Sequence, residues 1–236
     1  FFARMAAEPS PPRPFGVPEA SFRAAFERIF AAGDEPFCVV APFDVNPSFT
    51  TAAAAMLSLE TGGPMKVVNP AIASAGLCSL LATLAEGLAQ GWDRQRALDA
   101  IDELGPLCDS IFVPASPDWL ERAGRLRAIE EKLGELDGRV PVLRAGTRIT
   151  GVAVEESFEA AFARAVKVAG QRAGPVPVVV TIDHAAALAA AARVEQFARE
   201  QLDVSRVIVT ELSATFGSQL GPGAVGIGVA PALGGN

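Results

Sequence analysis

The chain has 236 residues and a formal net charge of −7, because 27 acidic residues outnumber 20 basic ones. Half of the residues are hydrophobic and a fifth are charged, which is typical of a globular protein and excludes a disordered chain. The acidic balance disfavours nucleic acid as a partner, since phosphates are bound by basic surfaces. No segment reaches the roughly 18 consecutive apolar residues of a membrane-spanning helix, and no N-terminal pattern indicates a signal peptide.

The three cysteines, Cys38, Cys78 and Cys108, lie thirty or more residues apart. This spacing fits neither a disulfide framework nor a zinc site, so we expect reduced thiols in a cytoplasmic protein. His184 is the single histidine, and no two cysteine or histidine residues have the spacing of metal ligands. The sequence therefore predicts no metal site and no cofactor.

Strands alternate with helices along the first half of the chain, as they do in parallel βαβ units. Apolar residues at helical spacing predict a helix over 18–32. Asn46-Pro47 has the pattern of an N-cap followed by proline at the first helical position. The expected elements, in chain order, are a helix at 1–7, a helix at 18–32, a strand at 37–41, a helix at 48–60, a strand at 65–68, helices at 74–91 and 93–104, and a strand at 110–114.

The second half differs, because a β-hairpin is expected at 140–144 and 147–154. This hairpin predicts a mixed sheet, so we place a domain boundary close to residue 114. An α/β fold with two domains follows, a parallel α/β domain over 1–114 and a smaller mixed-sheet α/β domain over 115–236. The remaining expected elements are helices at 116–121, 126–136, 156–171 and 185–201, and strands at 176–182, 206–210 and 221–229.

Two motifs suggest chemistry, and each also has a simpler structural interpretation. Residues 221–226 match GxGxxG, but the chain ends before the acidic residue that a dinucleotide site requires about twenty positions later. We interpret this segment as a tight turn into a strand. Asp183-His184 is a candidate acid–base pair, yet adjacent strand residues point to opposite faces and no nucleophile is implied nearby. We favour helix capping for Asp183 and predict no catalytic residue.

Loops at strand ends are the better candidates for a ligand site, because open parallel sheets bind ligands beyond the carboxyl ends of their strands. A crevice between two domains is another common location. Phe15 and Phe43 would make such a crevice apolar. Asn46 and Ser48 lie at an expected helix start, where free backbone amides attract anions.

These loops resemble those of the DegV family of fatty-acid-binding proteins, and the resemblance extends over nearly the whole chain. Each motif is weak alone, but together, in the right order and at compatible distances, they are specific. Ser74 and Gly76 are retained within a segment similar to the family's DSxxxSxG. The other similar segments are 1–5 and 22–34, which resemble the family's first helices, 42–52 at the SSxLSGTYxSA loop, 117–126 at LxYLxxGGRI, 140–143 at IKPIL, and 217–226 at GxHxGPGAxG.

The resemblance implies a protein that holds a long-chain fatty acid in the cleft between its two domains. It also implies a carrier rather than an enzyme, which presents the acyl carboxylate to a separate fatty acid kinase. The family's opening strand is expected to precede Phe1 and to be absent here.

The residues that contact the head group in the family are replaced in this chain. Family hydroxyl residues fall on Pro14, Phe15, Pro42, Phe43 and Asn46, the late histidine on Gln219, and the arginine after the hairpin on Glu155 or Glu156. Asn46 and Gln219 can each donate an amide N–H in their place. The predicted ligand-binding residues are Phe15, Phe43, Asn46, Ser48, Ser74 and Gln219.

Two alternatives stay open at this point. The replacements fit a relocated or less polar head group, but they also fit a structural or regulatory module that has kept the fold and lost the ligand. Equally, Asn46 fits a simple N-cap of its own helix, and Gln219 fits a solvated loop residue.

Overall fold

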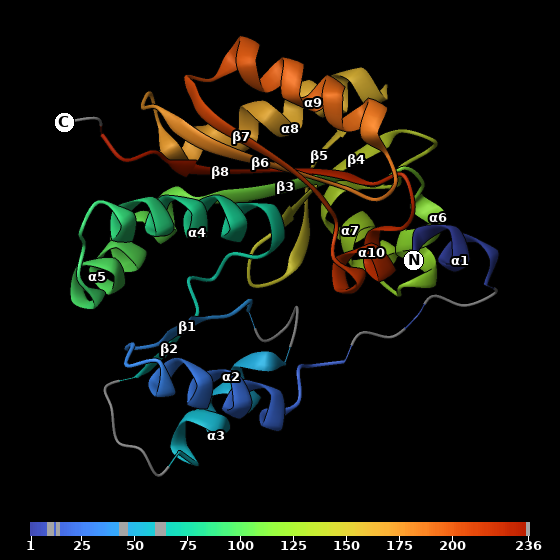
Figure 1. Cartoon of the computed structure of the whole chain (residues 1–236). Coiled ribbons are helices and arrows are strands. Elements are labelled where there is room, and N and C mark those ends of the chain that lie inside the picture. Colours follow the sequence, from blue (N-terminus) through green and yellow to red (C-terminus); the bar gives the residue numbers. More distant parts are fainter. Residues whose placement is uncertain (9–11, 13–14, 43–46, 60–64, 235–236) are drawn as a thin grey trace.

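The computed structural model describes residues 1–8, 12, 15–42, 47–59 and 65–234. Two sheets organise these residues (Figure 1). A two-stranded parallel sheet pairs β1 (Phe37–Val39) with β2 (Lys66–Val68), and a six-stranded mixed sheet has the order β5-β4-β3-β8-β6-β7. The protein is therefore an α/β protein with one parallel and one mixed sheet.

The small sheet is covered by α2 (Glu19–Ala31) and α3 (Ser48–Leu57), which lie on its side away from the large sheet (Figure 1). Two hydrogen bonds hold the segment before α2 against α3. The Val17 N–H donates to Ser48 Oγ at 3.1 Å, and Thr51 Oγ1 donates to the Val17 carbonyl at 2.8 Å. These hydrogen bonds hold the segment that leads into α2 beside α3.

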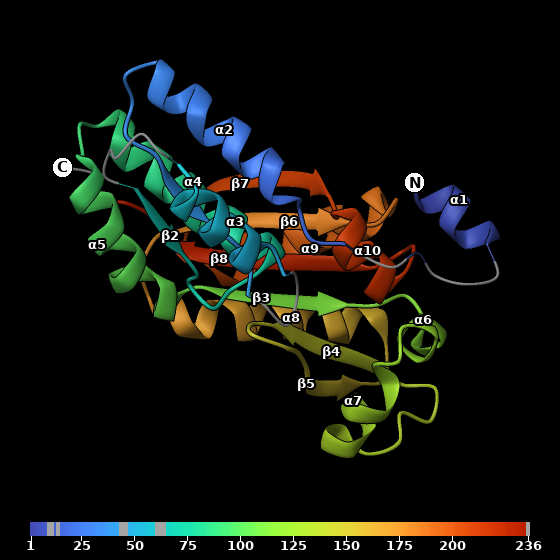
Figure 2. The ribbon, with the colours of Figure 1, turned by 90° about the horizontal axis from the view of Figure 1, so that it is seen from below.

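Figure 2 shows the strands of the large sheet side by side, with the small sheet and its helices over one face. Strand β8 is antiparallel to both of its neighbours, β3 and β6, whereas β6 and β7 are parallel. Both faces of β3, β6 and β8 are buried, which explains their near-continuous apolar runs. The six strands are β3 (Asp109–Val113), β4 (Val140–Ala145), β5 (Ile149–Glu155), β6 (Val178–His184), β7 (Val204–Glu211) and β8 (Val225–Pro231).

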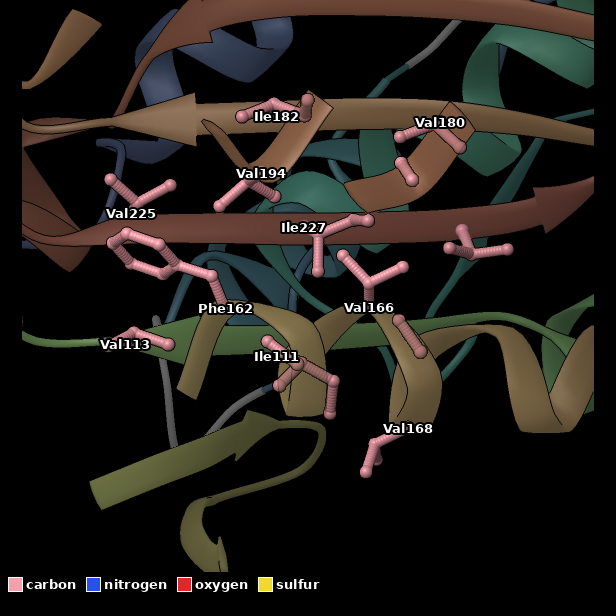
Figure 3. Packing of buried hydrophobic residues seen from close by; sticks show 14 of the residues in the cluster. Ile111, Val113, Phe162, Val166, Val168, Val180, Ile182, Val194, Val225 and Ile227 are labelled. Atoms are coloured by element: carbon pink, nitrogen blue, oxygen red, sulfur yellow. The ribbon is translucent and has the colours of Figure 1, made fainter. Parts of the chain in front are cut away.

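Helices α8 (Phe158–Ala173) and α9 (Leu188–Gln201) cover the other face of the large sheet. Figure 3 shows Phe162 and Val166 of α8 packed over Ile111 of β3 and Ile227 of β8. Burying each such side chain stabilises the fold by about 1.5–3 kcal/mol. This core holds rigid the strands whose ends border the site described below.

Helix α4 (Ser74–Ala89) packs on the face of the large sheet that is turned to the small sheet. It lies so close to β8 that a Cβ atom on Gly228 would overlap the backbone of Ala75. Two side-chain hydrogen bonds fasten the helix, from Ser79 Oγ to Thr181 Oγ1 and from Thr83 Oγ1 to the Pro231 carbonyl. Helix α5 (Arg94–Leu104) and a short 3₁₀ helix, η1 (Gly105–Leu107), follow it.

Four short helices gather around a second apolar cluster, which we call the lower cluster. They are α1 (Phe2–Ala7), α6 (Pro117–Arg122), α7 (Leu126–Leu133) and α10 (Ala214–Leu220). The large sheet contributes Phe112, Leu143 and Ile149 to the lower cluster. Its other larger buried members are Phe2, Met5, Leu120, Ile129, Leu212, Phe216 and Leu220.

The predicted positions of most helices and strands are confirmed, with shifts of a few residues at their ends. One strand assignment is wrong. The strand at 110–114 does not join a parallel first sheet, because β3 pairs antiparallel with β4 and β8 in the large sheet. A strand that is buried on both faces is a continuous apolar run whether it pairs parallel or antiparallel. The sequence pattern therefore does not reveal which strands it pairs with. Strands β1 and β2 form the small sheet and β3 to β8 form the large sheet, so the change from one sheet to the other falls between β2 and β3. The domain boundary near residue 114 stays a prediction.

A search of the described residues finds no helix with the length and apolar character needed to cross a membrane. The thiols of Cys38, Cys78 and Cys108 are free in the structure.

Candidate functional site

A cavity of about 340 Å³ lies beyond the carboxyl ends of β6 and β7, where the segment after β1 approaches the large sheet. This is the position at which open α/β sheets bind ligands. Its described lining combines carboxylates, hydroxyls and two apolar side chains. The lining residues are Ala41, Ser74, Asp183, Glu211, Ser213, Thr215 and Phe216.

Asp183 is the most buried ionisable residue of this lining, with 4% of its surface exposed. Ser74 Oγ donates a hydrogen bond of 2.6 Å to Asp183 Oδ2, and the Ala75 N–H also donates to this carboxylate. The N-cap residue of α4, Ala73, makes no side-chain cap hydrogen bond. Asp183 therefore supplies the acceptor that the first amides of α4 lack. The capping role expected for Asp183 is confirmed, but the helix that it caps is α4 rather than the one that follows β6.

Burial raises the pKa of Asp183 from 3.8 to about 6, while the hydrogen bonds from Ser74 and Ala75 act in the opposite direction. The apolar surroundings disfavour the charged carboxylate more than the two donors favour it. The carboxylate is thus charged at neutral pH and takes up a proton in mildly acidic solution.

Ser74 occupies an unusual backbone conformation at the start of α4, with φ of +50°. Few residues other than glycine adopt this left-handed region. The conformation accompanies the hydrogen bond of its hydroxyl to Asp183. Among the predicted ligand-binding residues that the structure describes, Ser74 is the one that lines the cavity.

Gln219 was expected in a loop, and this expectation is wrong. It lies in α10 with 5% of its surface exposed. Its carboxamide is engaged on both sides, because Arg125 Nη2 donates to Oε1 at 2.8 Å and Nε2 donates to the Thr215 carbonyl at 3.1 Å. Ser213 begins the helix, since its Oγ accepts a hydrogen bond from the Phe216 N–H. This N-cap serine was the sequence signal for α10.

The other predicted residues divide into two groups. Ser48 is buried and its hydroxyl accepts the Val17 N–H, whereas Phe15 is 87% exposed. Neither lines the described cavity. The predictions for Phe43 and Asn46 fall outside the described residues. Helix α3 begins at Ser48 as expected, but its N-cap position is Pro47, one residue later than the predicted cap.

Sequence reasoning missed Ala41, Glu211, Ser213 and Thr215 as lining residues. Phe216 stacks on Phe112 with ring centroids 5.5 Å apart, so the cavity is bordered by the lower cluster. The sequence does carry a signal for this region. Polar residues follow directly after β7, before the glycine-rich segment, and ligand sites of open α/β sheets lie at such strand ends.

The remaining motifs have structural roles. The His184 ring is buried, and its Nδ1 accepts the Ala187 N–H at 3.3 Å in the turn before α9. Segment 221–226 joins α10 to β8, and Gly221, with φ of +81°, lies against Trp119 with no room for a Cβ atom. The turn interpretation of GxGxxG is confirmed. Among the described residues, no cluster of three or more His, Cys, Asp or Glu is arranged to hold a metal ion.

Comparison with known proteins identifies the family. A family model described as "Uncharacterised protein, DegV family" matches residues 1–232. The chain belongs to the DegV family. A DegV domain-containing protein of Streptomyces coelicolor, SCO2569, is 29% identical to this DegV chain over 210 residues, which cover 87% of this chain and 74% of the relative.

Solved structures show the same DegV fold. A fatty-acid-binding DegV family protein from Thermus thermophilus matches 98% of this chain and 82% of its own, with a TM-score of 0.86 and 21% identity. A stearic acid-binding protein from Eubacterium ventriosum matches 98% of this chain and 82% of its own, with a TM-score of 0.79 and 18% identity. Such neighbours are described as fatty-acid-binding proteins.

Proposed function

We propose that this DegV protein is a carrier that holds one long-chain acyl lipid in the cavity beyond β6 and β7. The observation that carries the proposal is the composition of this cavity. Its polar residues gather at the strand ends, and Phe216 connects it to the lower cluster. A polar end beside an apolar region suits a molecule with a polar head and an acyl tail.

Energetics support an apolar tail beside the lower cluster. Transfer of an acyl chain out of water is worth about 0.8 kcal/mol for each buried CH₂ group. The chain therefore supplies most of the affinity, and the head group sets orientation and specificity. Because the acyl chain supplies most of the affinity, binding tolerates the replacement of the residues that contact the head group in the family pattern.

The two-domain arrangement is part of the proposal. Ala41 follows the small sheet, whereas Asp183 and Glu211 belong to the large sheet. A ligand bound among them would lie in the cleft between two domains built on the two sheets. Such a position allows the head group to be presented to a separate enzyme, and a fatty acid kinase is the partner that the family resemblance implies.

The test is to obstruct the cavity and measure binding of a fluorescent long-chain acyl probe. Ala41→Phe places a large side chain in the lining, and we expect a loss of binding of at least about tenfold. Ala189→Phe adds the same side chain on the exposed surface of α9 and should leave binding unchanged. Equal binding by both variants would place the ligand elsewhere, and no binding by the parent would favour a structural or regulatory module without a ligand.

A further inference from the structure

We propose that another cavity, which we call the second cavity, binds a small zwitterion of the α-amino acid class with an apolar side chain. The second cavity has a volume of about 300 Å³ and lies where the segment between β2 and α4 meets α5, η1 and the end of α8. Its described lining brings together the guanidinium of Arg172, the carboxylate of Asp102, the carboxamide of Asn69 and apolar side chains.

The second cavity is separate from the cavity beyond β6 and β7. The two cavities share no residue of their described linings. Strands β3 and β6 run in the same direction, because each is antiparallel to β8. The second cavity is lined by Gly105 and Pro106, just before β3 begins at Asp109, whereas the other cavity lies beyond the carboxyl end of β6. Binding in the second cavity therefore goes beyond the proposed carrier function and does not depend on it.

Arg172 is the group that would bind an anion. It lies in the last turn of α8, with Nη1 3.5 Å from the Cys108 carbonyl oxygen and Nε 3.6 Å from Asp109 Oδ2. Asp109 is bound more closely by Arg144, whose Nε and Nη2 donate to its carboxylate at distances between 2.8 and 3.0 Å. Charge-assisted hydrogen bonds are about 2.7–2.9 Å long, so both contacts of Arg172 are weak. They hold its guanidinium at the cavity and leave N–H donors for a ligand carboxylate.

Asp102 supplies the opposite charge from another element, the exposed side of α5. Among the described residues, no ion pair joins Asp102 to Arg172, so each charge can take a ligand group of its own. Asn69 Oδ1 accepts the Ala71 N–H at 2.9 Å, which leaves the amide nitrogen of Asn69 to donate. A ligand that bridges these walls needs a carboxylate for Arg172 and an ammonium group for Asp102.

The apolar part of the lining completes the match. Ile72 and Ile101 are 4% and 3% exposed, and Pro70 and Pro106 lie beside them in the lining. The volume is at the lower end of the range of about 300–1,000 Å³ that small-molecule sites occupy. An amino acid with an aliphatic side chain satisfies both charges and this apolar surface. A simple carboxylate would place negative charge beside Asp102, and a simple amine would place positive charge beside Arg172.

The test compares three probes that share one carbon skeleton and differ in their charged groups. Each is titrated into the full chain by isothermal titration calorimetry at pH 7.0. L-leucine carries both charges, 4-methylpentanoate lacks the ammonium group, and L-leucinamide lacks the carboxylate. We expect L-leucine to bind at least about tenfold more tightly than either analogue, because each analogue loses a charge-assisted contact. No binding of L-leucine, or equal binding of the three probes, would overturn the inference and leave the carrier function intact.

Two variants assign the two charged contacts. Asp102→Asn should weaken L-leucine binding by about tenfold and leave 4-methylpentanoate binding no weaker. Arg172→Gln should weaken both of these probes and spare L-leucinamide. Asp99→Asn, about one turn earlier on α5 and outside the described lining, should leave all three affinities unchanged. Because Arg172→Gln also removes a contact to Asp109, the exposed Asp102 variant keeps the test decisive if the Arg172 variant folds poorly. L-leucine binding that is unchanged by Asp102→Asn would contradict the inference.

Discussion

Asp183 is predicted to lower the stability of the fold at neutral pH, and Asp183→Asn should relieve this cost. Its pKa is raised from 3.8 to about 6 in the folded protein, so the folded state retains a proton that the unfolded state has already lost. The stabilisation that the protonated carboxyl provides is complete below about pH 4 and is lost as the pH rises through about 6. This rise of the pKa from 3.8 to about 6 corresponds to about 3 kcal/mol.

Thermal unfolding at two pH values measures this effect. For a chain of this size a change of 1 kcal/mol moves Tm by about 2–4 °C, so Asp183→Asn should raise Tm at pH 7.5 by about 6–12 °C. At pH 4 the gain should be small, because Asp183 in the parent is then protonated. Glu200→Gln, on the exposed surface of α9, serves as the control for a lost exposed charge. A gain of equal size at both pH values, or a loss of stability at pH 7.5, would refute the assignment of a desolvated carboxylate.

Two further changes test the packing that positions Asp183. Ser74→Ala removes the hydroxyl that donates to Asp183 and should lower the free energy of unfolding by about 1–3 kcal/mol in urea titrations at pH 7.5. An unchanged urea midpoint would show that the hydrogen bond contributes no net stability. Gly228→Ala places a Cβ atom against the backbone of Ala75 and should cost about 1–3 kcal/mol, whereas Gly234→Ala, with no atom within 4 Å of the added Cβ, should be neutral. Equal midpoints for the two glycine variants would contradict the close approach of α4 to β8.

Local sequence patterns predicted the helices and strands of the fold, but they did not predict every pairing between strands. Helical spacing identified α2, and the hairpin pattern identified β4 and β5, because each depends on residues close in sequence. The pairing of β3 with β8 joins residues more than a hundred positions apart. No local property of an apolar strand specifies such a partner, so the first sheet was predicted with one strand too many.

The candidate site also combines features that nearby residues predict with contacts between residues far apart in the sequence. Ser74 was recognised as a helix start, but its partner Asp183 lies 109 residues later in the chain. Gln219 was placed in a loop because glycine residues suggested one, whereas the Ser213 cap and the packing against Arg125 stabilise α10 there. The Ser213 cap is a local signal, whereas the contacts of Ser74 with Asp183 and of Arg125 with Gln219 depend on the tertiary fold, and sequence spacing does not encode them.

The most direct measurement of the central claim is the mass of the protein purified from cells under native conditions. The carrier function predicts one retained long-chain acyl lipid per chain, which lipid extraction will identify. Ala41→Phe, purified in parallel, should carry less of this lipid than Ala189→Phe. A bare protein mass for the parent, together with no uptake of added acyl lipids, would contradict the account.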